Sequence, residues 1–370
     1  MKRLALCCLM LLIAPGCASR GPNRVEKDRA GYGEAIGDSW KAQTLLNIVR
    51  LRYLDWPTFL SIEQLAAAYT WNMNGAFTTQ IRTPFLGDND QLQLGGGVSF
   101  QERPTVIYRP ISGVNFVRSM LAPVPPAIVL ALIQAGWEAD RLVQTLFHSV
   151  NGFKNLNSGT EVAYRPAPEF LRFSRLMRVL QSENAISSEI EVPTLAGAAQ
   201  AAGTQGQARV IGDSKLSFQL DEMSNETREE FELMRRELNL DTDTDTYRVT
   251  WGIRRENDQT IAVQTRSMIG LMGALALAVD IPQEDLDDGS APYFEPVPEV
   301  PNEGARSLMR VRSGLEMPDN AYVATLYDGH WYWIDKADSN SKRTFAYLSM
   351  LLTVTEGGEG GGAPLVLSVN

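Results

Sequence analysis

Cysteine and histidine are scarce in this sequence. The 370 residues contain three cysteines, of which Cys7 and Cys8 lie close to the N-terminus, and two histidines, His148 and His330. A zinc site built from such residues needs several ligands at close spacing, and neither histidine lies in a motif of paired ligands. We therefore predict no metal site and no cofactor, and we expect His330 to be a packing partner across a hairpin.

Positive charge and long apolar runs are also in short supply. The formal net charge is −10, and an acidic surface repels phosphate backbones, so we expect no nucleic-acid partner. No run of 18 or more apolar residues occurs, whereas a membrane-spanning helix needs about 20. The most apolar internal segment, residues 268–279, is short and predicts a buried helix.

The first residues have the order of an export signal. Lys2 and Arg3 precede an apolar run at residues 4–13, and small residues follow. The segment IAPGC, residues 13–17, resembles the lipobox of bacterial lipoprotein precursors. The resemblance implies a signal peptide over residues 1–16 and an acylated, palmitate-bearing Cys17 as the new N-terminus.

Cys17 is the only cysteine left once such a signal is removed, so it has no partner for an internal disulfide. Each buried methylene of an acyl chain contributes ~0.8 kcal/mol, so two or three chains anchor a protein stably. Ala18 carries no aspartate-type retention signal, which by the same resemblance implies the outer membrane, with the body facing the periplasm. The alternative is an ordinary secretory signal that happens to contain Cys17.

Composition along the chain predicts four further parts. Residues 17–37 are polar, rich in glycine and proline, and typical of a lipidated tether. Residues 38–190 have helical periodicity and predict a helix-rich N-terminal domain. Residues 191–210, rich in Ala, Gly and Gln, indicate a linker or mobile loop, and residues 211–370 predict an α+β C-terminal domain.

The whole chain is expected to be α+β, with mainly antiparallel sheets covered by helices. We predict helices over residues 38–53 and from Pro168, a short strand over residues 105–108, and a strand rather than a helix over residues 142–150, before an Asn-Gly turn. Residues 280–303 hold eight acidic residues, no basic residue and five prolines, and predict an exposed loop.

Two segments of the C-terminal half predict similar strand–strand–helix units. The first has strands at residues 247–253 and 260–263, the second returning beside the first after Asn257-Asp258, and a helix from Arg266. The second has strands at 322–327 and 330–334, joined by Asp328-Gly329, a preferred pair for a tight hairpin turn, and a helix over 341–354. Duplication or chance similarity explains the parallel, and the sequence leaves both open.

Two groups of side chains are candidates for contact with a partner. One group lies in the second hairpin, and it predicts either a contact surface for protein or glycan or a buried central hairpin: Tyr322, Tyr327, Trp331, Tyr332 and Trp333. The other group forms a stripe on one helix, where it indicates a face for an anionic partner or, more often, a solvated side: Arg172, Arg175 and Arg178.

No arrangement of residues predicts catalysis. Asp241, Asp243 and Asp245 alternate as in a calcium loop, but the motif's glycine and glutamate positions hold Thr246 and Gly252. No Gly-x-Ser-x-Gly elbow and no phosphate loop occurs.

We therefore expect a non-enzymatic binding or assembly component with an envelope protein partner. The alternative is a hydrolase of cell-wall glycan or peptide that uses paired carboxylates. Residues 46–53 and 341–345 resemble segments of bacterial lipoproteins without an assigned activity, which adds support for an exported protein only.

Overall fold

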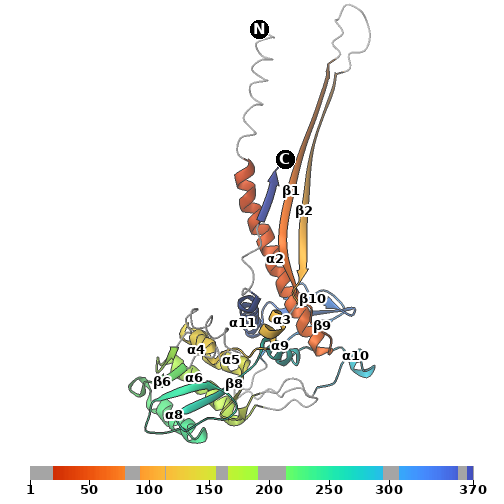
Figure 1. The fold of residues 1–370 in the computed structure, drawn as a ribbon. Coiled ribbons are helices and arrows are strands. Elements are labelled where there is room, and N and C mark those ends of the chain that lie inside the picture. Colours follow the sequence, from red (N-terminus) through yellow and green to blue (C-terminus); the bar gives the residue numbers. More distant parts are fainter. Residues whose placement is uncertain are drawn as a thin grey trace, which may run out of the picture. The chain divides into compact units, whose positions relative to one another are not determined.

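A computed structural model gives the fold in two compact units, which are described separately (Figure 1). Unit 1 comprises residues 1–57 and 119–352, and unit 2 comprises residues 58–118 and 353–370. The structure describes residues 20–79, 92–112, 114–155, 166–190, 214–294, 308–356 and 365–369. The predicted signal peptide, Cys17 and residues 191–210 lie outside this part.

Unit 2 is built on two long strands, β1 (Leu60–Thr79) and β2 (Leu92–Pro110), which pair antiparallel from Leu60–Pro110 to Thr79–Leu92. At about 3.3 Å per residue, each strand extends roughly 60 Å. β12 (Leu365–Val369) adds in parallel to β1. The predicted strand at residues 105–108 is therefore only part of β2, because apolar alternation marks only a fraction of a strand that backbone pairing extends much further.

The first helix of unit 1, α2 (Arg20–Arg52), begins well before the predicted start at residue 38. It therefore includes most of the residues that we expected to form a tether. Pro22 lies in the first turn, where a missing N–H costs nothing, and each interior glycine costs only about 1 kcal/mol. The buried residues Leu45, Ile48 and Val49 lie in the part that the apolar periodicity predicts.

Unit 1 also contains a six-stranded sheet. Its strand order is β4-β3-β8-β7-β6-β5, and its members come from both sides of residues 191–210. The strands are β3 (Phe147–Val150), β4 (Phe153–Lys154), β5 (Ile186–Ile190), β6 (Ser214–Phe218), β7 (Thr246–Trp251) and β8 (Thr260–Thr265). The sheet therefore combines strands from the two predicted domains, residues 38–190 and 211–370, because strands distant in sequence pair with one another.

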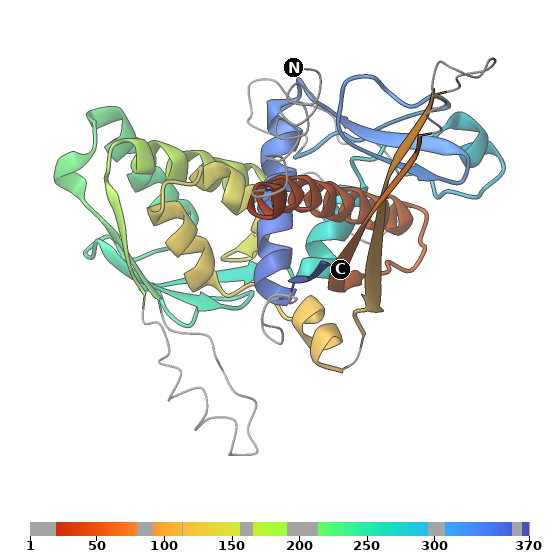
Figure 2. The ribbon, with the colours of Figure 1, turned by 90° about the horizontal axis from the view of Figure 1, so that it is seen from above.

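Helices α4 (Pro126–Gln134), α5 (Ala139–Leu146) and α6 (Pro168–Ser182) contact the strands of this sheet, and α8 (Asn225–Glu237) packs on α6. Figure 2 shows the helices drawn in yellow to yellow-green beside the strands. The helix predicted from Pro168 is confirmed as α6, and its apolar side chains at helical spacing, Phe170, Phe173, Met177 and Leu180, are all buried. Ser224 caps α8 by accepting a hydrogen bond from the N–H of Thr227.

The pairing of β7 with β8 is parallel, not the antiparallel return that we expected. The Asn257 side chain accepts hydrogen bonds from the N–H of Gln259 and the hydroxyl of Thr260, so this turn starts β8 without closing a hairpin. Ile261, Ala262 and Val263 are all buried, which is typical of a central strand covered on both faces.

Residues 142–150 are helix and then strand. α5 ends at Leu146 and β3 begins at Phe147, so the strand prediction is right only for the last four residues. The Asn-Gly turn is confirmed: Asn151 and Gly152 have φ values of 47° and 90° and join β3 to β4. Asn151 also accepts a hydrogen bond from the N–H of Ala262, which fixes the hairpin to β8.

The second sheet of unit 1 has the order β10-β11-β9, with β9 (Arg312–Gly314), β10 (Ala321–Tyr327) and β11 (His330–Asp335). The predicted hairpin is confirmed, since Asp328 and Gly329 take φ values of 44° and 81°. α9 (Met268–Ala276), α10 (Gln283–Asp287) and α11 (Ser339–Glu356) complete the described helices of this part, and α3 (Val114–Leu121) lies where the two units join in sequence.

The α+β class with mainly antiparallel sheets is confirmed. The two predicted strand–strand–helix units differ, however, because β7 and β8 pair in parallel whereas β10 and β11 pair antiparallel. None of the helices in the described part of the chain combines the length and apolarity that a bilayer crossing requires.

Candidate functional site

The β10–β11 hairpin places its aromatic residues on two different faces. Cross-strand pairing sets Leu326 opposite Trp331 and Ala324 opposite Trp333, so these four side chains share what we call the outer face. Leu326 is 54% exposed, and both tryptophans are half-buried. A sheet face that meets water is normally polar, whereas the four side chains of the outer face are apolar.

Two features of β9 shape the outer face. Gly314 lies opposite Trp331, and a Cβ atom there would come within 3.3 Å of the Trp333 ring, so a larger residue would crowd this ring. Leu315 and Met317, which follow β9, are 74% and 62% exposed. Further apolar side chains are therefore exposed in the residues that follow β9.

The three tyrosines lie on the opposite, inner face, which packs on α2 and α11. Tyr332 is fully buried, and Tyr322 packs edge-on against Phe345 of α11. Tyr327 stacks at 5.0 Å from the Tyr53 ring and hydrogen-bonds Asp55. The predicted set of five aromatic residues is thus divided: the tyrosines pack on the inner face, as in a buried hairpin, whereas the two tryptophans lie half-buried on the outer face, where a contact surface stays a prediction.

A polar cluster lies at the end of α2, within this inner face. The Tyr53 hydroxyl donates to Asp285 of α10, and its oxygen lies 2.5 Å from the Tyr332 hydroxyl. Asp285 is only 8% exposed. The prediction of an exposed loop over residues 280–303 is therefore wrong for this segment, because α10 turns Asp285 inward to a hydroxyl more than 200 residues away in sequence.

Burial makes these hydroxyls weak acids. Burial, followed by the hydrogen bonds to Asp285 and Tyr332, raises the pKa of Tyr53 far above its usual value. Burial likewise raises the pKa of Tyr332 to about 12. Both residues therefore stay neutral at physiological pH and act as hydrogen-bonding groups that orient the Asp285 carboxylate.

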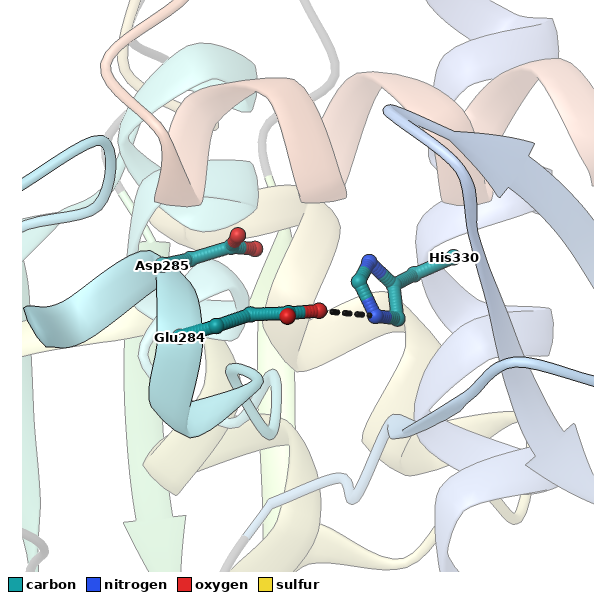
Figure 3. A group of neighbouring side chains, drawn as sticks. All are labelled: Glu284, Asp285 and His330. Carbon is teal, nitrogen blue, oxygen red and sulfur yellow. Dashed lines mark ion pairs between the residues drawn. The ribbon is translucent and has the colours of Figure 1, made fainter. Parts of the chain in front are cut away.

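His330 adds a nitrogen ligand to this cluster. Its ring reaches from β11 toward Glu284 and Asp285, and its Nε2 lies 2.9 Å from Oε1 of Glu284 (Figure 3). The residue is 8% exposed, and its Nδ1 has no hydrogen-bond partner in the described part of the chain. His330 does lie opposite Tyr327 across the hairpin, but its polar contact is with α10.

Each member of the trio Glu284, Asp285 and His330 offers one ligand atom within 4.8 Å of the others. The sequence could not reveal this convergence. The adjacent Glu284-Asp285 pair lies in a segment read as a loop, and no motif links it to a histidine 45 positions further along.

The arginine stripe on α6 is not a uniform free surface. Arg172 forms an ion pair with Glu237 of α8, which joins two helices of the same layer. Arg175 is exposed. Arg178 donates to Oε1 of Gln181 at 2.8 Å and lines a surface pocket of about 400 Å³.

This pocket lies between the ends of α4 and α6 and strand β5, and no aspartate or glutamate lines it. The Gln181 amide, one of its walls, donates to the carbonyls of Ile133 and Trp137 and so ties α6 to α4. The pocket offers one cation and several amide and hydroxyl groups, and not the paired carboxylates that glycan hydrolysis needs.

The acidic triplet has partners within the protein. Asp241 accepts hydrogen bonds from the Gln259 amide and from the N–H of Asp243, and Asp245 lies 3.5 Å from Arg235. The hydrogen bonds of Asp241 and the ion pair of Asp245 stabilise the turn before β7. Cys17 lies outside the described residues.

Comparison of the chain with protein-family models, with curated proteins and with solved structures finds no match.

Proposed function

We propose that the protein is a lipid-anchored, non-enzymatic binding or assembly component of the bacterial envelope, with a protein partner. The observation that carries the proposal is the outer face of the β10–β11–β9 sheet. Tryptophan and leucine side chains that lie half-buried to exposed on one flat face are characteristic of contact surfaces.

The composition of the outer face fits a protein partner. Trp331 and Trp333 provide large, rigid contact areas, and Leu326 provides the most exposed apolar position on the strands. Arg312 lies opposite Trp333 on β9 and supplies a cation at the rim. Aromatic residues and arginine are the residue types enriched in the energetic centres of protein interfaces.

The proposed attachment is through acyl chains on Cys17, at the periplasmic side of the outer membrane. Its support is the order of positive residues, apolar run and IAPGC segment in residues 2–17. Fractionation of cells that express Cys17→Ser tests it. We expect the variant to leave the membrane fraction, and a variant held there as firmly as the wild type would contradict the proposal.

Site-specific crosslinking tests the contact surface. A photoreactive amino acid at Leu326 is expected to form one discrete crosslinked product in intact cells. The same amino acid at Glu229, an exposed position on α8, serves as the control and should form none. The Leu326 product should disappear when Trp331 and Trp333 are both changed to serine.

The proposal fails if Leu326 and Glu229 crosslink alike, or if the double tryptophan variant keeps the product. A hydrolase remains the alternative function, and it predicts release of fragments from purified cell wall. Two carboxylates that a hydrolase could use already have partners, since Tyr53 donates to Asp285 and Glu284 pairs with His330. No aspartate or glutamate lines the described pocket.

A further inference from the structure

From the polar cluster of α10 and β11 we infer a binding site for a divalent transition-metal ion, of which Zn²⁺ is the representative, with Glu284, Asp285 and His330 as ligands. This inference does not depend on the proposed contact surface. It departs from the expectation of no metal site, which considered only ligands close together in sequence.

The geometry brings one nitrogen and two carboxylates to a common point (Figure 3). Their ligand atoms lie within 4.8 Å of one another. Glu284 pairs with Nε2 of His330 at 2.9 Å, which leaves Nδ1 of the same ring as its free nitrogen. Two ligands of one zinc ion, each at about 2.0–2.2 Å from it, lie about 3–4 Å apart. Glu284 has a 68% exposed side chain and can rotate to complete the set.

One buried member of the trio has an unused ligand atom. His330 and Asp285 are each 8% exposed, and Nδ1 of His330 has no hydrogen-bond partner within the described residues. Buried polar atoms are normally paired, since an unpaired one costs roughly 1–3 kcal/mol. A cation bound through Nδ1 would give this nitrogen a partner and would compensate the two adjacent carboxylates.

The surroundings resemble the outer shell of a metal site. Tyr53 donates to Asp285, and the Tyr332 hydroxyl lies 2.5 Å from that of Tyr53, so a chain of two hydroxyls orients the carboxylate. Hydrogen bonds to a ligand side chain, made by residues that do not touch the metal, commonly fix the orientation of metal ligands. The nearby Arg52 guanidinium donates to the carbonyl of Pro292, which holds the end of the same acidic segment.

The donor set selects the class of ion. An imidazole nitrogen with two carboxylates suits first-row transition metals better than Ca²⁺ or Mg²⁺, which prefer all-oxygen sites. Three protein ligands leave a fourth position for water. The bound ion would join α10 to β11 and so hold the acidic segment onto the inner face of the hairpin sheet.

Metal titration of the purified full chain, free of a polyhistidine tag and of bound metal, tests the inference. Calorimetry with Zn²⁺ should show one saturable site, and Zn²⁺ should raise the unfolding temperature. Glu284→Gln changes an exposed ligand without disturbing the core, and it should weaken binding at least about tenfold. The control Asp287→Asn, on the same helix but outside the cluster, should bind like the wild type.

Co²⁺ as a spectroscopic probe distinguishes the ligands. Nitrogen and oxygen ligands should give only weak visible bands, which Glu284→Gln and His330→Gln should both alter. Absence of saturable Zn²⁺ binding by the wild type would overturn the inference. So would equal affinity in Glu284→Gln and Asp287→Asn, or an intense near-ultraviolet thiolate band, which would place the metal on a cysteine.

Discussion

At the scale of single residues, Tyr53 links three elements that are far apart in sequence. It follows α2, stacks on Tyr327 of β10, donates to Asp285 of α10 and meets the Tyr332 hydroxyl of β11. Each contact depends on a protonated hydroxyl or on the ring. The stability of this region should therefore depend on pH in the alkaline range.

The folded-state pKa values of Tyr53 and Tyr332 lie above the usual value of 10, and that of Tyr332 is about 12. The folded state then binds more protons than the unfolded state between pH 10 and 12, so the free energy of unfolding should fall as pH rises through this window. Below pH 10 the contribution is fully present. Urea unfolding at pH 7 and pH 11 measures the loss.

The change Tyr53→Phe should reduce the difference in the free energy of unfolding between the two pH values, because one of the tyrosines with a raised pKa is gone. At pH 7 it should cost about 1–3 kcal/mol, since Asp285 loses its donor. Tyr293→Phe, at a 67% exposed position, is the control and should behave like the wild type. An unchanged pH dependence in Tyr53→Phe would contradict this account.

At the scale of elements, backbone conformation decides where glycine is needed. Gly329 closes the β10–β11 hairpin with a φ of +81°, a left-handed conformation that side chains other than glycine rarely adopt. Gly33 lies inside α2 with open space around it. The same substitution should therefore have opposite effects at these two positions.

We expect Gly329→Ala to lower the free energy of unfolding by roughly 1 kcal/mol or more, because alanine is strained in that turn. Gly33→Ala should raise helix stability by about 0.5–1 kcal/mol, because alanine loses less backbone entropy on folding. Thermal unfolding of both variants beside the wild type measures the two shifts. Shifts of the same sign would show that the turn does not require its left-handed conformation.

Elements also show the limit of prediction from local pattern. The apolar spacing of α6, the Ser224 cap and the Asp328-Gly329 turn were predictable, because each depends on residues within a few positions. The length of β1 and β2 was not, since their pairing brings Leu60 to Pro110 across fifty residues. The candidate metal ligands were missed for the same reason.

At the scale of the whole molecule, one sheet joins the two halves of the chain. Strands β3, β4 and β5 precede residues 191–210 and β6, β7 and β8 follow them, with β5 paired to β6 and β3 paired to β8. The two halves share a core as well, because α6 packs on α8 and α4 packs on β7. A break in the connecting chain should leave this sheet intact.

A specific protease site inserted at residue 200 tests this. After cleavage, the two fragments should elute together in size-exclusion chromatography under native conditions and separate only in denaturant. Separation without denaturant would mean that the halves fold as independent domains, as the composition alone suggested.

Local chemistry in the sequence by itself determined the class of the fold, the helices α6, α9 and α11, and the tight turns at Asn151-Gly152 and Asp328-Gly329. These features follow from dihedral preferences and side-chain periodicity, which act over a few neighbouring residues. Tertiary structure alone decided that β8 runs parallel to β7, that the hairpin aromatics divide between two faces, and that Tyr53, Asp285 and His330 meet. Strand partners and buried polar contacts depend on which surfaces come together in three dimensions, and a one-dimensional pattern does not record that.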